Sequence, residues 1–168
     1  LILVFIVMAS QFESFTMPFV IMFSIPFAFT GVIVALFITG TTLSLVAALG
    51  AVLLIGIVVK NGIVLIDYTN LMRDRGMELY EAIAVSGKSR LRPVLMTAAT
   101  TVLGMLPLAL STGEGAEIWR PMGITVIGGL VFSTMVTMVI VPVMYGIMAR
   151  HGERNKKKEV IKQFQFMD

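Results

Sequence analysis

One charged side chain interrupts a long apolar stretch of this 168-residue chain and is the strongest candidate for chemistry. Lys60 lies within an apolar run from Leu43 to Ile66. If that run is a membrane helix ending near Asp67 to Asn70, Lys60 lies about ten residues, roughly 15 Å, inside it. An ionised lysine at a helix centre costs about 2.5–3.5 kcal/mol on insertion scales, so such groups face the protein interior and mark ion or substrate pathways. The alternative interpretation is a lysine that reaches the headgroups.

The counter-charge that Lys60 requires is not found in the apolar runs. The nearest acid along the chain is Asp67, which directly follows this run in the same predicted helix. It shares a helix face with Lys60 but lies about 10 Å further along the axis, which is too far for a direct ion pair. We therefore expect the partner acids to come from another part of the protein or from another chain.

Other polar residues accompany Lys60. Asn61 is adjacent, and Thr97 and Thr101 share one face of the next long apolar span, with Arg90 on the same face where this span meets the cytoplasm. Together they favour a hydrated polar seam beside Lys60. In the alternative interpretation, each threonine hydroxyl donates to a carbonyl of its own helix, and Arg90 is a simple anchor on the cytoplasmic side.

Residues 82–89 satisfy a loosened phosphate-loop pattern, but we do not expect a nucleotide site there. That motif requires a glycine-rich loop between a strand and a helix, whereas the residues before Gly87 are predicted to be helical. No metal site or cofactor is expected either, because the chain has no cysteine and its single histidine, His151, lies in the tail.

The composition determines which elements can hold these residues. The chain is 57% hydrophobic and 14% charged, with a mean hydropathy of +0.94, whereas a soluble domain has about 25% charged residues. This excludes an ordinary soluble domain and a disordered chain. The sequence predicts an all-α membrane protein.

Four apolar runs are long enough to cross a hydrocarbon core of about 30 Å, namely 18–38, 43–66, 93–110 and 122–149. The opening residues 1–9 are too short to cross the core. They lack a basic leader and a cleavage site, so they do not resemble a signal peptide. We interpret them as the end of a fifth helix. Pro26 is expected to kink the first span. Residues 77–86 are amphipathic and predict a short cytoplasmic helix along the membrane surface. Six glycines are expected to permit close helix packing: Gly50, Gly56, Gly104, Gly123, Gly128 and Gly129.

The positive charges predict the orientation. Residues 67–92 hold five Lys and Arg residues and residues 150–162 hold six, whereas the connections 39–42 and 111–121 hold none and one. The positive-inside rule therefore places the first two segments in the cytoplasm. We divide the chain into a bundle, 1–149, and a basic cytoplasmic tail, 150–168, that contacts anionic lipid rather than nucleic acid.

Several motifs, in this order, resemble the inner-membrane pump of the resistance-nodulation-division (RND) efflux family, of the multidrug type. They are QFESF at 11–15, IVVKNGIVLIDY at 57–68, RLRPVLMT at 90–97, GMLPL at 104–108, STG at 111–113 and VPV at 141–143. The resemblance covers residues 1–149 and implies the last four of twelve spans, preceded by the end of the eighth.

The resemblance also implies a mechanism. A lysine at the position of Lys60 pairs with two aspartates of the absent half, and Thr97 and Arg90 complete a proton relay; Asn61 follows the family pattern. The implied function is export of drugs or other amphiphiles by proton antiport, without enzymatic activity. The implied partners are the N-terminal half and periplasmic domains of the same pump, two further copies, a periplasmic adaptor and an outer-membrane channel, in the bacterial inner membrane.

Other interpretations remain open. One alternative is a relative that uses the same transmembrane proton-coupling domain to export lipids, metal ions or proteins. Metal export is less favoured, because the spans offer methionine but neither cysteine nor histidine as metal ligands. A membrane-embedded hydrolase lacks a histidine in any span and a serine paired with a base. A purely structural anchor, or a fragment inactive by itself, leaves Lys60 unexplained.

Overall fold

The computed structural model describes residues 1–13 and 15–165, and side chains up to His151. These residues form α1 (Ile2–Phe12), α2 (Thr16–Met22), α3 (Ile25–Thr39), α4 (Leu45–Asp74), α5 (Leu79–Ala109) and α6 (Ala116–Gln165). They contain no strand, which confirms the all-α fold. Four stretches are long and apolar enough to cross a membrane, 16–39, 45–74, 79–109 and 116–151, and the shorter α1 matches the predicted end of a fifth helix.

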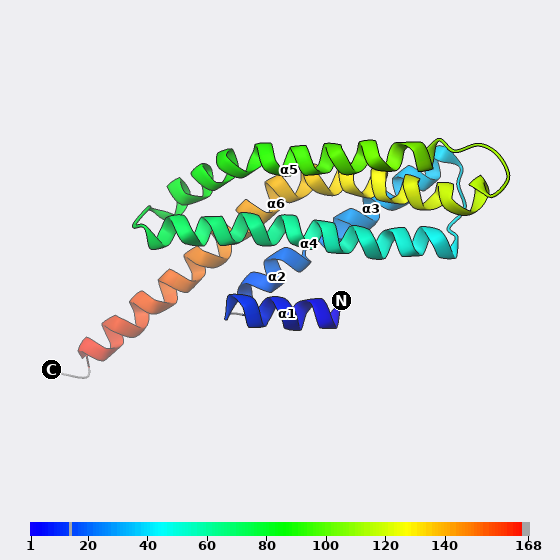
Figure 1. Ribbon diagram of the computed structural model, residues 1–168. Coiled ribbons are helices and arrows are strands. Elements are labelled where there is room, and N and C mark those ends of the chain that lie inside the picture. The colour runs from blue at the N-terminus through cyan, green and yellow to red at the C-terminus, as the bar shows by residue number, and fades with distance from the viewer. Residues whose placement is uncertain (14, 166–168) are drawn as a thin grey trace.

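The long helix α6 organises the bundle. It packs against α3, α4 and α5, as Figure 1 shows. α5 runs antiparallel to α4 after the short connection 75–78, and α6 runs antiparallel to α3 and parallel to α4. The short connections 40–44 and 110–115 lie together at one end of the bundle, and the 75–78 connection lies at the other. This alternation of connections is the one that the predicted topology requires.

The first complete span is broken between α2 and α3. The amide of Ser24 donates to the Ile21 carbonyl at 3.0 Å, which is a tighter turn than in a regular α-helix. Pro26 follows in the first turn of α3, where its missing N–H costs least. The predicted kink at Pro26 is confirmed.

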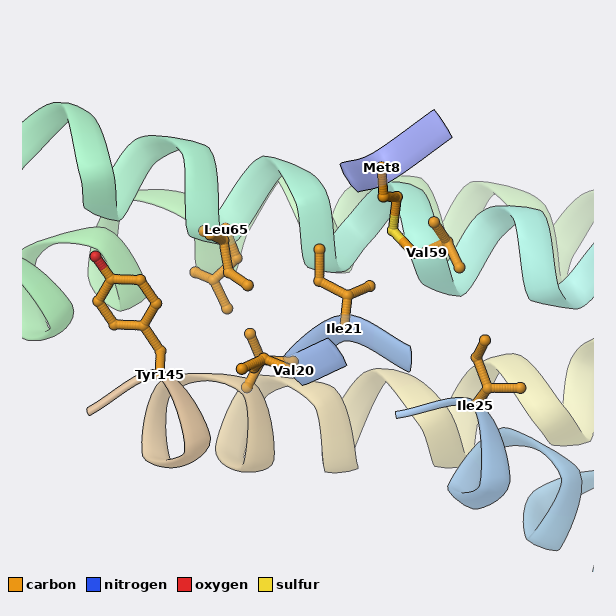
Figure 2. Packing of buried hydrophobic residues seen from close by; sticks show 9 residues of the cluster. Met8, Val20, Ile21, Ile25, Val59, Leu65 and Tyr145 are labelled. Carbon is orange, nitrogen blue, oxygen red and sulfur yellow. The ribbon is translucent and has the colours of Figure 1, made fainter. Parts of the chain in front are cut away.

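Apolar side chains of α1, α2, α3, α4 and α6 form one buried cluster, shown in Figure 2. Val20 and Ile21 of α2 have no exposed surface, and Tyr145 of α6 closes the cluster at one side. A second buried cluster, around Leu54 and Leu130, contains side chains of α3, α4, α5 and α6. It lies toward the end of the bundle that holds the 40–44 and 110–115 connections. Because much apolar surface outside these clusters is exposed, the bundle suits lipid or protein surroundings rather than water.

Close backbone approach explains four of the six glycines. A Cβ atom at Gly123 would lie 2.7 Å from the backbone nitrogen of Ala109, and one at Gly50 would lie 3.1 Å from the Met122 carbonyl oxygen. Cβ atoms at Gly128 and Gly129 would clash with side chains of α3 and α4. Within this chain Gly56 and Gly104 make no such contact, since no atom lies within 4 Å of a Cβ there, and for these two positions the prediction stays a prediction. Both face outward in this chain.

The predicted separate amphipathic helix was also wrong. Residues 79–92 form the first turns of α5, which continues through Pro93 into the span. The apolar face of this segment packs on protein instead of lipid: Leu79 and Ile83 contact the first buried cluster, and a Cβ atom at Gly146 would lie 3.4 Å from Ile83 Cδ1. A proline in a membrane helix is tolerated where neighbouring groups satisfy the freed carbonyl.

The last helix is longer at both ends than its predicted span. α6 begins at Ala116, after a connection in which Gly113 and Gly115 have positive φ values of 128° and 87°. Only glycine adopts such angles readily. α6 then continues without a break beyond Ala149 into the predicted tail. The basic side chains predicted for the tail, Arg150 apart, lie outside the residues whose side chains are described.

Candidate functional site

Lys60 lies at the middle of α4, with 15 residues before it and 14 after it. The helix starts at Ser44, whose hydroxyl caps it by accepting from the Ala47 amide at 3.1 Å. Thirty residues give α4 a length of about 45 Å, more than a hydrocarbon core requires, so either end of α4 can reach a headgroup region while Lys60 stays near the centre. This position favours the deep location predicted from the sequence.

The Lys60 side chain is exposed on the surface of this bundle. It shares an exposed face of α4 with Gly56 and Asp67, while Val58, Val59 and Gly62 are buried on the opposite face. Among the residues described, none makes a hydrogen bond or ion pair with Lys60, and no group of three His, Cys, Asp or Glu residues could hold a metal ion. Lys60 therefore presents an unpaired ammonium group to whatever covers this face.

Thr97 lies at the depth of Lys60. The guanidinium of Arg90 stacks on the Tyr68 ring at 4.6 Å from its centroid, which aligns these two residues across the antiparallel pair of α4 and α5. Because both helices rise by about 1.5 Å per residue, Lys60, eight residues before Tyr68, is level with the residue that follows Thr97. The half-buried Asn61 is at the same level.

The threonine hydroxyls donate to their own helix. Thr97 Oγ1 donates to the Val94 carbonyl at 2.9 Å, and Thr101 Oγ1 donates to the Thr97 carbonyl at 2.8 Å. This is the alternative interpretation that the sequence left open. Each hydroxyl oxygen still has lone pairs that can accept a hydrogen bond, and the Thr97 side chain is exposed. The Thr97 hydroxyl can therefore accept a hydrogen bond from another group while it still donates to the Val94 carbonyl.

Arg90 is not at the level of Lys60. It precedes Thr97 by seven residues, about 10 Å along the axis, and stacks on Tyr68. Its Nε is buried without a hydrogen-bond partner among the residues described. The structure thus brings Lys60, Asn61 and Thr97 to one depth and places Arg90 nearer to the 75–78 connection.

The phosphate-loop pattern is helical throughout. Residues 82–89 lie inside α5, and Ser86 donates to the Ala82 carbonyl at 2.6 Å. The backbone N–H groups are therefore committed to the helix and cannot surround a phosphate. The structure confirms that this segment is helical and lacks the loop that the motif requires.

Two sets of polar residues were missed by sequence reasoning. The hydroxyl of Tyr145 donates to Asn70 Oδ1 at 2.6 Å and joins α6 to α4. Four hydroxyl side chains, moreover, are buried without a hydrogen-bond partner: Ser24, Thr125, Thr134 and Thr137. The spacing of Thr134 and Thr137 within an apolar run was the available signal, because i and i+3 share a helix face.

Comparison with known proteins agrees with the motifs. The profile of the AcrB/AcrD/AcrF family matches residues 1–149. The chain is 41% identical over 153 residues to the cobalt-zinc-cadmium resistance protein CzcA of Cupriavidus metallidurans, covering 91% of this chain and 14% of that protein. It is 43% identical over 158 residues to the swarming motility protein SwrC of Bacillus subtilis, covering 94% and 15%.

Two further comparisons concern a drug-resistance protein and a solved structure. The multidrug resistance protein MdtC of Erwinia amylovora is 43% identical over 143 residues, covering 84% of this chain and 14% of MdtC. The crystal structure of a heavy metal efflux pump superposes with a TM-score of 0.79 at 34% identity, covering 88% of this chain and 14% of the pump. The chain thus spans about one seventh of the length of these relatives.

The spans, the motif order and these matches agree with one another. The chain is a multi-pass membrane protein segment, and it belongs to the AcrB/AcrD/AcrF family of resistance-nodulation-division transporters.

Proposed function

We propose that this chain is part of a proton-driven efflux transporter and supplies the lysine of its proton-coupling site. The observation that carries the proposal is Lys60, an unpaired ammonium group at the middle of α4 with no counter-charge among the residues described. A charge at that depth is costly unless an acid compensates it. The compensating carboxylates belong to the absent N-terminal half, as the family resemblance implies.

The coupling follows from electrostatics. Ionised carboxylates facing Lys60 hold its ammonium group, and protonation from the far side removes their charge and releases Lys60. The helices then rearrange. One charge that crosses 100 mV contributes about 2.3 kcal/mol, enough to shift a two-state equilibrium several-tenfold. Thr97 and Asn61, at the depth of Lys60, offer hydrogen bonds to the released groups, and Arg90 lies on the route toward the cytoplasm.

For the cargo, we propose drugs or other amphiphiles, as for MdtC. Metal cations are the second candidate, favoured by the similarity to CzcA and to the heavy metal efflux pump. The periplasmic portion, which lies outside this chain, decides between them. The proposed proton-coupling mechanism is the same for both cargoes. Export of either cargo involves no chemical transformation, so we propose that the protein is not an enzyme.

The proposed assembly is a homotrimer in the bacterial inner membrane with the C-terminus in the cytoplasm. Each copy includes the N-terminal half and the periplasmic domains, and the trimer works with a periplasmic adaptor and an outer-membrane channel. The relatives' greater length supports the presence of those further domains. The bilayer covers the remaining apolar surface.

The proposal is tested by Lys60→Ala in the full-length transporter. Export of a fluorescent amphiphile and proton flux in proteoliposomes should both fall to background, while the amount of protein in the membrane is unchanged. Lys88→Ala is the matched control, because Lys88 is an exposed lysine of α5 outside the central layer. Undiminished export by Lys60→Ala, at equal abundance, would remove Lys60 from the mechanism.

A second variant, Lys60→Arg, separates charge from geometry. A guanidinium is planar and always charged, and it spreads its donors over a wider fork than an ammonium does. We therefore expect Lys60→Arg to lose export although the positive charge is kept. Export at the wild-type rate would show that any cation suffices at this position.

The cargo is tested separately from the engine. Cells that carry the wild-type transporter are challenged with a panel of amphiphilic drugs and with Co²⁺, Zn²⁺ and Cd²⁺. Drug tolerance that depends on Lys60, without a change in metal tolerance, supports the first candidate. Metal tolerance alone would replace it with the second and leave the role of Lys60 intact.

A further inference from the structure

Four hydroxyl groups are buried without a hydrogen-bond partner among the residues described: Ser24, Thr134, Thr137 and, about three turns before Thr137 in α6, Thr125. The exposed fractions of Ser24, Thr134 and Thr137 are 1%, 6% and 5%, and their oxygens contact no donor or acceptor among the residues described. Adding the rest of the transporter can only bury them further. A buried polar group without a partner destabilises the fold, so Ser24, Thr134 and Thr137 together require an explanation.

These residues differ from the other helical hydroxyls. Thr69 is as deeply buried, at 4%, yet its Oγ1 donates to the Leu65 carbonyl at 2.8 Å. Ser86, which is fully buried, likewise donates to the Ala82 carbonyl at 2.6 Å. The usual solution of bonding to the preceding turn is therefore used elsewhere in this chain but not at Ser24, Thr134 or Thr137.

The register of the helices brings the three hydroxyls to one level. α3 and α6 are antiparallel, and a Cβ atom at Gly31 would lie 2.5 Å from Phe132 Cβ and 3.0 Å from the Gly128 carbonyl oxygen. Gly31 is thus level with the middle of 128–132 in α6. Ser24 precedes Gly31 by seven residues, and because the two helices are antiparallel, it is level with Thr137, about seven residues further along α6. Thr134 lies one helical turn from Thr137 on the same face of α6.

A third helix confirms this level independently. Asn70 of α4 bonds Tyr145 of the parallel helix α6, so Gly62, eight residues earlier in α4, is level with Thr137. A Cβ atom at Gly62 would lie 2.9 Å from Ile21 Cγ2, which belongs to the turn preceding Ser24. Ser24, Gly62 and Thr137 thus meet where α2–α3, α4 and α6 converge.

The same place holds a backbone acceptor. Pro26 has no N–H, so the carbonyl of Met22 lacks the donor that a regular helix would supply from that residue. Met22 lies at the break between α2 and α3, two residues before Ser24. Three hydroxyls and one carbonyl are the two to four polar partners that a buried water molecule uses.

We propose that Ser24, Thr134 and Thr137 hold internal water at the break between α2 and α3. The site lies behind α4, on its buried face and at the depth of Lys60, so it is separate from the exposed face that carries the lysine. The water satisfies the hydroxyls and the Met22 carbonyl together. Because hydrogen bonds to water can be exchanged, the bend between α2 and α3 can change without leaving the Met22 carbonyl unpaired.

The experiment is a structure of the full-length transporter in lipid at a resolution that shows ordered water. We expect density within hydrogen-bond distance of Oγ of Ser24 and Oγ1 of Thr137. The Thr137→Val variant, which replaces a hydroxyl by a methyl group of the same shape, should lose this density. Thr69→Val is the matched control, because Thr69 is equally buried but bonded to its own helix, and it should keep the density.

Two results would overturn the proposal. One is a map in which all three hydroxyls bond to their own helix and no density lies between them. The other is density that persists in a Ser24→Ala/Thr137→Val double variant, since the hydroxyls would then not hold it. If Thr137→Val does not fold, Ser24→Ala, which removes a single hydroxyl at the helix break, is compared with the wild type in its place.

Discussion

At the scale of single residues, α4 and α6 are joined by one hydrogen bond near the 75–78 connection. Tyr145 is 2% exposed, and its hydroxyl donates to Asn70 Oδ1 at 2.6 Å. Arg90 stacks on Tyr68 two residues earlier in α4 and joins α5 to the same region. These contacts tie three helices together at one end of the bundle, about two turns or more from Lys60.

The first prediction concerns Tyr145→Phe in the full-length transporter. The substitution removes one hydroxyl and leaves Asn70 Oδ1 without its donor, so we expect a loss of about 1–2 kcal/mol of stability, measured as a lower melting temperature in detergent. Tyr80→Phe is the control, since Tyr80 is 66% exposed and should melt like the wild type. Equal melting of both variants would show that the bond between Tyr145 and Asn70 contributes nothing.

At the scale of elements, α5 is the least enclosed of the four spans in the described residues. Only 11% of its most apolar window is buried, compared with 50% for α6. Its attachment to α6 depends on the small residues Ala109 and Gly123, where the two backbones come together. Neighbouring helices in lipid gain little from apolar burial and depend on such close contact. The stability of this pair is therefore sensitive to one methyl group.

The second prediction tests that sensitivity with Gly123→Ala. Its Cβ would lie 2.7 Å from the Ala109 backbone nitrogen, which cannot move aside as a flexible side chain can. We expect a loss of about 1–3 kcal/mol, seen as a lower melting temperature of the full-length transporter. Gly104→Ala adds the same methyl group to α5 where no atom lies within 4 Å, and it should be neutral or stabilising by up to about 1 kcal/mol.

At the scale of the whole molecule, the positive charges are segregated between the two ends of the bundle. The 75–78 connection and the first turns of α5 carry Arg75, Lys88, Arg90 and Arg92, whereas the connections 40–44 and 110–115 carry no Lys or Arg and the first turns of α6 carry only Arg120. The 40–44 and 110–115 connections lie at one end of the bundle, and the 75–78 connection lies at the other (Figure 1). This arrangement supports, by the positive-inside rule, a cytoplasmic 75–78 connection.

The third prediction tests this topology by cysteine labelling. The chain has no cysteine of its own, so single substitutions can be introduced into a full-length protein freed of other cysteines. Thr42→Cys and Thr112→Cys, both at exposed positions, should react with a membrane-impermeant maleimide on intact spheroplasts. Glu78→Cys should react only after lysis. The reverse labelling pattern would invert the orientation and place the tail outside.

The sequence alone was sufficient for everything that depends on chain composition and local spacing. Apolar runs of about twenty residues determine four helical spans, since strands of a closed barrel, the other structure that satisfies the backbone in lipid, are about ten residues long with alternating hydrophobicity. The missing N–H of Pro26 determines the kink. The place of Lys60 within a long apolar helix and the absence of an acid close to it in the sequence are also readable from residue order. The helical state of the residues before Gly87 was also predicted from the sequence, and the structure confirms it.

Only the tertiary structure decided how the helices meet, because side-chain partners far apart in the chain leave no local signal. The stacking of Arg90 on Tyr68 aligns α5 with α4. The hydrogen bond from Tyr145 to Asn70 aligns α6 with α4. Packing likewise separated the glycines at backbone contacts from Gly56 and Gly104, which face outward. It also decided that residues 79–92 pack on α6 instead of on lipid, and it brought the hydroxyls of Ser24 and Thr137 to one buried level.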